Sequence, residues 1–344
     1  MERDEKYMRR AMELAGWGLG SVSPNPMVGC VIVHDDQIIG EGWHRKFGGP
    51  HAEVHAINQV ADSSLLPAST VYVNLEPCSH FGKTPPCADL LVEKQVKRVV
   101  IANRDPNPQV AGRGIDRLRS AGVEVTEGLL EKEGRWLNRR FFINMERQMP
   151  YVILKWAESA DGFMASSSRA PVWISNERSR QRVHQWRAEE DAVLVGAGTA
   201  QSDNPRLNVR DWTGRNPVRV VFDPNLRLPS GLHLFDGSQS TLCYNHLRTE
   251  TKPGVAFIQV SEQDFLSGVM ADLLKRNIGS VMVEGGPYTL QKFLEAGLWH
   301  EARVFRSKQT LTDGVAAPRL EGPAFHTDDA TGDRLSIYLN SSSH

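Results

Sequence analysis

The sequence has few cysteines, no long apolar run and no excess of either charge. Four cysteines among 344 residues are too few for a disulfide framework. No apolar run is long enough to cross a bilayer, and the N-terminal MERDEKYMRRAMELAGWG lacks the apolar core of a signal peptide. The 40 basic and 41 acidic residues give a formal net charge of -1, which indicates no global basic surface for nucleic acid. These absences predict a cytoplasmic protein that acts on a small molecule, without membrane or nucleic-acid partners.

Helix and strand patterns alternate along the chain and restart after Pro150, which indicates two α/β domains, residues 1–148 and 149–340. In the first half, MVGCVIV and QIIGEGW predict a hairpin, and the segments that follow predict β-α units. This order implies a mixed sheet with helices on both faces. The segment LLEKEGRWLNRRFFINME predicts one longer helix. The second half begins with the apolar strand of RQMPYVILKWAESADG and again alternates helices and strands. Its further predicted strands are AVLVGAG, PVRVVFD, STLCYN, SVMVEGG and EARVFRS.

A histidine and two cysteines have the identities and order expected of a catalytic zinc site. The stretch GGPHAEVHA contains His51 and His55, four residues apart, and LEPCSHFGKTPPC contains Cys78 and Cys87, each after a proline. Catalytic zinc takes three protein ligands and keeps a fourth position for water. The set His51, Cys78 and Cys87 would supply those ligands, and zinc would lower the pKa of the bound water toward neutrality.

Glu53, two residues after His51 at the start of a predicted helix, is the expected proton carrier. It would take a proton from the water and return it to the ring nitrogen and the departing ammonia, as in the H-x-E…P-C pattern of zinc-dependent base deaminases. A structural zinc site is the alternative, and it would need a fourth protein ligand from His55 or His80. The position of each ligand segment at a strand-to-helix junction favours the catalytic interpretation. His55 is then expected to be a packed or solvated helix residue.

The two cysteines depart from C-x-x-C spacing because the loop SHFGKTPP separates them. With SPNPMVGCVIV and GEGWHRKFGGPHAE, this loop resembles the deaminase domain of the bifunctional riboflavin-biosynthesis deaminase-reductases. The resemblance implies a cytidine-deaminase-like α/β/α fold for the first domain. It also implies a substrate site lined by Asn25, His44, His80 and Lys83, of which Lys83 would be suited to a phosphate.

The second half lacks the G-x-G-x-x-G fingerprint of a Rossmann domain. Its glycine-rich segments are VGAGTA and VEGGPYTL, and each follows an apolar strand. The second precedes a helix that begins near Pro287, where backbone amides would be able to receive a diphosphate. A strand that ends in glycines is also an ordinary tight turn, so the segments alone do not assign a cofactor.

The segments LKWAESADG, WRAEEDAVLVGAGTAQSDNPRLNVR and VEGGPYTL occur in this order, and together they resemble the reductase domain of the same family. The resemblance spans about residues 150–310 and implies an α/β fold similar to dihydrofolate reductase. The NADPH-binding residues that it implies are Ala157, Trp173, Thr199, Asp203, Gly286 and Pro287. The substrate contacts that it implies are Lys155, Arg187, Leu207, Arg210 and Glu284.

Chemistry supports several of these roles. Arg187 and Arg210 are suited to bidentate binding of a ribose 5-phosphate, although either alone would be interpreted as a surface ion pair. Lys155 would polarise or hydrogen-bond the sugar oxygens, and Asp203, in the turn SDNP, would hold a hydroxyl or assist proton transfer. We therefore expect Lys155 and Asp203 to be catalytic. Pro171 stands where the reductase pattern commonly has serine, and EARVFRSKQTLTDG also departs from that pattern.

The combined expectation is a bifunctional enzyme that uses Zn²⁺ and NADPH. The first domain would deaminate 2,5-diamino-6-(ribosylamino)-4(3H)-pyrimidinone 5′-phosphate, and the second would reduce its ribosyl group to ribityl. The alternatives are a deaminase with a degenerate reductase domain, a nucleic-acid or nucleoside zinc deaminase, and a zinc-stabilised interaction protein. A homo-oligomer is expected. The residues do not decide between NADPH and NADH, since Arg227 is the sole candidate for a 2′-phosphate contact.

Overall fold

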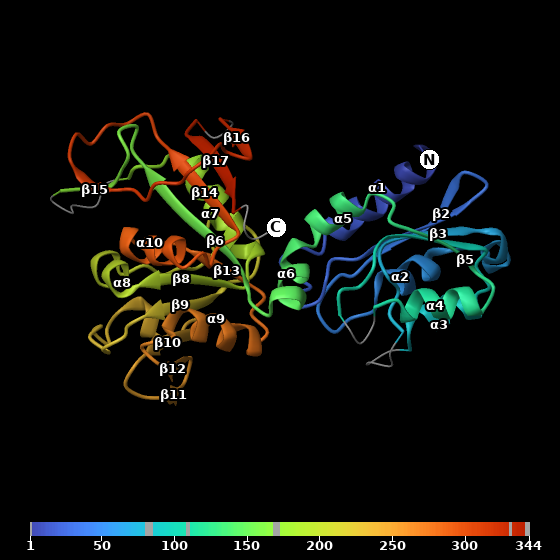
Figure 1. Ribbon diagram of the computed structural model, residues 1–344, viewed down its shortest axis with the longest axis horizontal. Coiled ribbons are helices and arrows are strands. Elements are labelled where there is room, and N and C mark those ends of the chain that lie inside the picture. The colour runs from blue at the N-terminus through green and yellow to red at the C-terminus, as the bar shows by residue number, and fades with distance from the viewer. Residues whose placement is uncertain (1, 80–84, 108–110, 168–172, 330–331, 341–344) are drawn as a thin grey trace. The chain divides into compact units, whose positions relative to one another are not determined.

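The computed structural model describes residues 2–79, 85–107, 111–167, 173–329 and 332–340 (Figure 1). The chain divides into two compact units, Met1–Gln148 and Met149–His344, and each unit contains its own large sheet. Within the described ranges, no helix is long and apolar enough to cross a membrane.

The first unit is built on a five-stranded mixed sheet with the strand order β2-β1-β3-β4-β5. The β1–β2 and β1–β3 pairs are antiparallel, whereas β3–β4 and β4–β5 are parallel. The predicted hairpin followed by β-α units is therefore confirmed. The strands are β1 Gly29–His34, β2 Gln37–Trp43, β3 Thr70–Leu75, β4 Arg98–Asn103 and β5 Glu124–Glu127.

Helices cover both faces of this sheet, as the sequence predicts. Val31 and Val33 of β1 pack in a cluster with Met8 of α1, whereas Cys30 and Ile32 pack in the cluster that includes α2, α3 and α4. Figure 1 shows α1 and α5 on one face and α2, α3 and α4 on the other. The helices are α1 Glu2–Gly16, α2 Ala52–Gln59, η1 Ser63–Ala68, α3 Cys87–Glu93, α4 Arg113–Ser120, α5 Glu131–Leu137 and α6 Arg139–Arg147.

The predicted long helix over LLEKEGRWLNRRFFINME is wrong, because the segment forms α5 and α6 with a break at Asn138. The backbone of Asn138 lies at φ -95° and ψ 21°, outside the α-helical region. Its side-chain oxygen accepts from the Met27 N–H at 2.8 Å, and its amide donates to the Met27 carbonyl at 2.9 Å. This contact between distant parts of the chain stabilises the break, and local periodicity contains no sign of it.

The second unit is built on a ten-stranded sheet with the order β11-β12-β10-β9-β8-β13-β6-β14-β17-β16. The strands from β12 to β14 in this order run parallel, and antiparallel strands flank them on both sides. The strands that the sequence predicts are β6 Tyr151–Glu158, β8 Ala192–Gly196, β9 Val218–Phe222, β10 Thr241–Asn245, β13 Ser280–Val283 and β14 Glu301–Arg306.

The strands that the sequence analysis missed are short, from three to six residues, and such lengths carry little periodicity. They are β7 Phe163–Ser166, β11 Glu250–Lys252, β12 Val255–Gln259, β15 Gly314–Ala316, β16 His326–Asp328 and β17 Arg334–Leu339.

Helices also cover both faces of the second sheet. Val304 of β14 faces the core cluster that includes Leu273 of α9 and Phe293 of α10, whereas the next residue, Phe305, stacks on Trp186 of α7 at 5.4 Å between ring centroids. The helices of this unit are α7 Glu177–Glu189, α8 Ala197–Asp203, η2 His233–Phe235, α9 Phe265–Lys275 and α10 Pro287–Glu295.

Candidate metal centre and candidate reductase site

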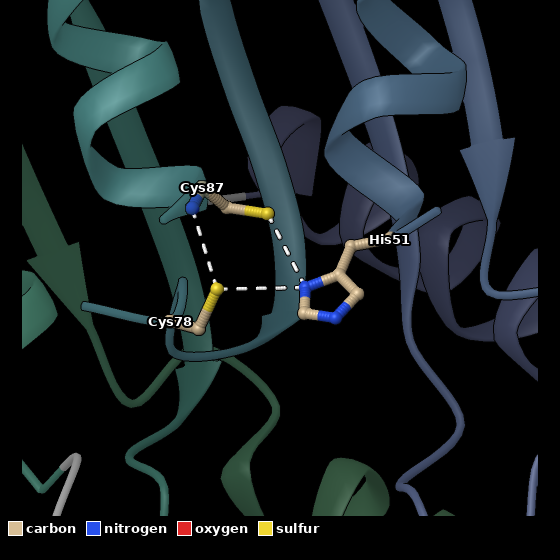
Figure 2. A group of neighbouring side chains, drawn as sticks. All are labelled: His51, Cys78 and Cys87. Carbon is tan, nitrogen blue, oxygen red and sulfur yellow. Dashed lines mark hydrogen bonds between the residues drawn. The ribbon is translucent and has the colours of Figure 1, made fainter. Parts of the chain in front are cut away.

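Three predicted ligands converge in the first unit. His51 is the N-cap of α2, Cys78 lies just beyond β3, and Cys87 is the first residue of α3. His51 Nδ1 lies 3.5 Å from Cys78 Sγ and 3.4 Å from Cys87 Sγ, and the three ligand atoms lie within 4.8 Å of one another (Figure 2). The Cys87 backbone N–H donates to Cys78 Sγ at 3.3 Å. The starts of two helices thus bring these residues together.

The donor set fits a catalytic zinc ion. One imidazole nitrogen and two sulfurs are ligands that zinc prefers, and three protein ligands leave a position for water. Hydrogen bonding with Cys87 lowers the pKa of Cys78 to about 4, although burial alone would raise it, so this sulfur is suited to bind metal as a thiolate. Within the described part of the chain, neither His55 nor any other histidine, cysteine or carboxylate joins this group. His80, the other candidate fourth ligand, lies outside that part.

Glu53, the second residue of α2, is a buried carboxyl group next to these ligands. Its side chain is 2% exposed, and its Oε2 atom has no hydrogen-bond partner among the described residues. Burial raises the pKa of Glu53, and the negative charge of Cys78 raises it further. A buried oxygen without a partner is costly, so a proton or a polar ligand is needed at this position. A water molecule on the metal would meet that need.

His44 lies beside His51, and Asn25 contacts His44. His44 Nδ1 is 3.0 Å from the Pro50 carbonyl, and its Nε2 is 3.2 Å from Asn25 Nδ2. The carbonyl accepts, so Nδ1 carries the proton and Nε2 accepts from the asparagine. The His44 and His51 rings are 5.6 Å apart and nearly perpendicular. Two of the residues expected to line the substrate site therefore lie beside the ligand group. The others, His80 and Lys83, lie outside the described residues.

In the second unit, the two glycine-rich segments meet. Gly196 is the N-cap of α8 and Gly286 is the N-cap of α10, and neither helix start has a side-chain cap. A Cβ atom at Gly196 would overlap the Thr289 hydroxyl, and one at Gly286 would lie 3.2 Å from Thr199 Oγ1. The two helices follow the adjacent parallel strands β8 and β13. Ligands of α/β proteins commonly bind beyond the carboxyl ends of such strands, and helix starts favour phosphate groups.

A buried charge cluster lies beside these segments, because Glu284 directly follows β13. Arg187 of α7 donates through Nε and Nη2 to the two Glu284 carboxylate oxygens at 2.7 and 2.9 Å. Lys155 Nζ of β6 lies 3.7 Å from the same carboxylate. Burial alone would raise the pKa of Glu284, but the charges of Arg187 and Lys155 lower it to about 2. The bidentate edge of Arg187, expected to bind phosphate, is thus paired with Glu284 in this structure.

Arg210, the other expected phosphate ligand, has a half-exposed side chain. His184, which the sequence analysis did not select, holds the backbone at this point. The Arg210 N–H donates to His184 Nδ1 at 3.4 Å, and His184 Nε2 lies 3.1 Å from the Asp211 carboxylate. The His184 side chain is 2% exposed. The sequence signal for it is weak, because a single histidine in a polar helix has no distinguishing pattern. Leu207, three residues before Arg210, is buried.

The other residues predicted for the reductase site lie in helices, in a strand and at the surface of the second unit. Asp203 is the last residue of α8 rather than part of a turn, and its exposed carboxylate accepts from the Ser202 hydroxyl at 2.7 Å. Trp173 is 72% exposed and lies under the Arg180 guanidinium. Ala157 lies two residues beyond Lys155 on β6, and Pro287 begins α10. Arg227 is exposed. Pro171 lies outside the described residues.

Comparisons with known proteins assign a family to each of the two units. Residues 1–103 match the family model of the cytidine and deoxycytidylate deaminase zinc-binding region, and residues 150–309 match that of the RibD C-terminal domain. The chain is therefore a two-domain enzyme that joins a zinc-binding deaminase domain to a reductase domain.

Similar proteins cover nearly the whole chain. The riboflavin biosynthesis protein RibD of Aquifex aeolicus is 38% identical over 321 residues, 92% of this chain and 90% of that protein. RibD of Actinobacillus pleuropneumoniae is 42% identical over 343 residues, 95% of this chain and 89% of that protein. The crystal structure of a diaminohydroxyphosphoribosylaminopyrimidine deaminase/5-amino-6-(5-phosphoribosylamino)uracil reductase from Thermotoga maritima has a TM-score of 0.89 and 37% identity, covering 98% of both chains.

The chain belongs to the RibD family of riboflavin biosynthesis proteins. The predicted bifunctional deaminase and reductase, the predicted fold class, and the zinc and NADPH cofactors are thereby confirmed.

Proposed function

We propose that residues 1–148 hydrolytically deaminate 2,5-diamino-6-(ribosylamino)-4(3H)-pyrimidinone 5′-phosphate and that residues 149–340 then reduce its ribosyl group to ribityl. The observation that carries the proposal is the convergence of His51, Cys78 and Cys87 beside the buried carboxyl of Glu53. The similarity to the Thermotoga protein, which is named for both activities, supports this substrate class.

In the deaminase unit, His51, Cys78 and Cys87 would hold zinc. When bound, zinc supplies a Lewis acid that brings the pKa of water near neutrality. Glu53 accepts one proton of the attacking water and delivers it to the ring nitrogen, and it then passes the remaining hydroxyl proton to the amine, which leaves as ammonia. Burial raises the pKa of Glu53, which favours the protonated form that delivers the proton. Asn25 and His44 contact the pyrimidine from the His51 side, and His80 and Lys83 complete the substrate site.

In the reductase unit, NADPH supplies the hydride for the anomeric carbon of the sugar. We propose that the cofactor contacts Ala157, Trp173, Thr199, Asp203, Gly286 and Pro287, with its diphosphate at the start of α10. Arg210 binds the sugar phosphate with its accessible guanidinium, and the buried Leu207 contributes an apolar contact to the substrate. Lys155, held by Glu284, hydrogen-bonds the sugar oxygens, and Asp203 assists proton transfer. Arg187 holds Glu284 in place and completes the substrate contacts.

We also propose a cytoplasmic homo-oligomer that acts on a small molecule. The near-neutral net charge supports a small-molecule substrate over nucleic acid. Light scattering of the purified chain tests the oligomeric state.

The decisive experiment incubates the protein with the pyrimidine phosphate, with and without NADPH, and identifies the products by mass. Without NADPH we expect one product, in which oxygen replaces the exocyclic amine. With NADPH we expect a second product that has gained two hydrogens. Deamination alone in both reactions would show a degenerate reductase, and an unchanged substrate would contradict the whole proposal.

A further inference from the structure

Glu76 connects the zinc-ligand loop to a helix that contributes no ligand. It lies between the end of β3 and Cys78, and it is 4% exposed. Its backbone N–H donates to the Asn103 carbonyl at the end of β4 at 2.9 Å. The main chain is therefore held to the sheet two residues before Cys78.

The Glu76 carboxylate is saturated with backbone hydrogen bonds. Its Oε1 atom accepts from the N–H groups of Gly114 at 2.9 Å and Ile115 at 3.3 Å. Its Oε2 atom accepts from Asp105 at 3.2 Å and Gly112 at 3.0 Å. Gly112 is the N-cap of α4 and has no side chain to cap that helix. A glutamate remote in sequence thus does the capping, and its charge is favoured at a helix start.

Direct packing reinforces this connection. A Cβ atom at Gly114 would overlap the Pro77 carbonyl oxygen, so the first turn of α4 lies against the residue before Cys78. On the other side, the Ala88 N–H of α3 donates to the Cys78 carbonyl at 3.1 Å. The Cys78 main chain is therefore held between the starts of α4 and α3.

We propose that Glu76 is a positioning residue for Cys78, which raises the zinc affinity of the site by holding the ligand loop against α4. This inference rests on the proposed metal-binding role of His51, Cys78 and Cys87. Outer residues that orient metal ligands typically change metal affinity by about 10- to 100-fold. Because Glu76 acts through the main chain and not on a ligand atom, we expect the lower end of that range.

The test measures zinc affinity of the full-length protein by competition with a chromophoric chelator. Glu76→Gln keeps the size of the side chain but turns an amide donor toward two N–H donors. We expect zinc binding to weaken about tenfold. Gly114→Ala disturbs the same contact from the α4 side, and we expect a change in the same direction. If Glu76→Gln does not fold, as judged by circular dichroism, Gly114→Ala decides the question by the same measurement.

Asp223→Asn is the matched control. Asp223 is also buried after a strand, and its carboxylate accepts from the backbone N–H groups of Arg227 at 2.9 Å and Leu228 at 3.0 Å, but it belongs to the second unit. We expect it to lose thermal stability without a change in zinc affinity. Unchanged zinc affinity in folded Glu76→Gln would overturn the proposal and leave Glu76 as a helix cap alone.

A second readout separates positioning from catalysis. Ammonia release by Glu76→Gln is expected to recover as buffered free zinc is raised, whereas Glu53→Gln binds zinc normally and does not recover. Failure of Glu76→Gln to recover at saturating zinc would also overturn the positioning role. Failure of the proposed function has a different signature, since the unsubstituted protein would then bind no zinc at His51, Cys78 and Cys87.

Discussion

The two sites of this chain satisfy their buried polar groups in opposite ways. In the first unit, Glu53 has a carboxylate oxygen without a partner among the described residues, and it faces a set of soft metal ligands. In the second, the buried carboxylate of Glu284 is paired with both Arg187 and Lys155. We expect a metal ion and a water molecule to complete the first site. In the second site, the charge of the buried carboxylate is compensated within the protein.

This difference determines what each unit tolerates. A site that depends on a bound metal and water can lose the metal, or have Glu53 substituted, while the fold remains. A site completed by internal ion pairs cannot lose one member without leaving the others buried and uncompensated. Loss of function without loss of fold is therefore expected in the first unit, and loss of both is expected in the second.

Removal of zinc is expected to produce the largest effect. Treatment with a strong chelator should reduce ammonia release to background. The zinc ion that His51, Cys78 and Cys87 would hold is the proposed Lewis acid, and without it the water is not activated. Oxidation of NADPH with pre-deaminated substrate should continue at its original rate. Parallel assays of ammonia and of absorbance at the NADPH band measure the two activities. Equal loss of ammonia release and NADPH oxidation would contradict the independence of the two sites.

Glu53→Gln should lower ammonia release by about 10²- to 10⁴-fold, the usual contribution of a general acid-base group. The amide keeps the shape of the side chain but cannot carry the proton. Zinc content, measured by atomic emission, should remain that of the unsubstituted protein, and NADPH oxidation should be unaffected. Substantial residual deamination would assign the proton transfer to another group.

Glu284→Gln should destabilise the second unit by about 3–5 kcal/mol, because it leaves Arg187 and Lys155 buried without a counter-charge. Hydrogen exchange followed by mass spectrometry would show faster exchange in β6 and β13 and unchanged exchange in β1 and β3. Uniform acceleration in both units would contradict their independence. Exchange as slow as in the unsubstituted protein would show that the ion pairs contribute no net stability.

The same pairing makes the second unit sensitive to acid. The pKa of Glu284 is lowered from 4.5 to about 2, so its ionised form stabilises the folded state. That contribution, about 3 kcal/mol, is fully present above pH 4.5 and declines as the pH falls from 4.5 toward 2. The stability difference between the unsubstituted protein and Glu284→Gln, measured by local hydrogen exchange, should narrow over this interval. A difference independent of pH would rule out the ionised carboxylate as its source.

Arg210→Ala should give the smallest effect, because this side chain is half exposed and makes no short ion pair. We expect the KM of the reductase reaction to rise about tenfold, the loss of one charge-assisted hydrogen bond to phosphate, with kcat nearly unchanged. Arg206→Ala, an exposed arginine in the same segment, is the control. Equal effects of the two substitutions would indicate general electrostatic attraction rather than a specific contact.

Much of the first site could be predicted from sequence because its signals are local. The prolines before Cys78 and Cys87, the position of His51 before a helix and the spacing of Glu53 are all evident within short segments. His51 was chosen over His55 as the ligand because one histidine and two cysteines already make a three-ligand zinc site. Glu76 was missed, although it lies in the same motif, because its role depends on the backbone amides of Asp105, Gly112, Gly114 and Ile115.

The second site was harder to predict because its residues are paired with one another. Arg187 and Glu284 are 97 positions apart, and no local pattern links them. Each was expected to contact the substrate, and neither was expected to hold the other. His184, which organises the backbone at Arg210, belongs to a polar helix without a distinguishing periodicity.

The sequence by itself determined the two α/β units, the candidate zinc ligands, the carboxyl group beside them and the glycine-rich helix starts, because these depend on periodicity and on chemistry within a few residues. Only the tertiary structure decided the break at Asn138, the anchoring of Cys78 through Glu76 and the burial of Arg187 against Glu284. Those features arise when distant strands and helices become neighbours, and hydrogen bonds and ion pairs act only over a few ångströms.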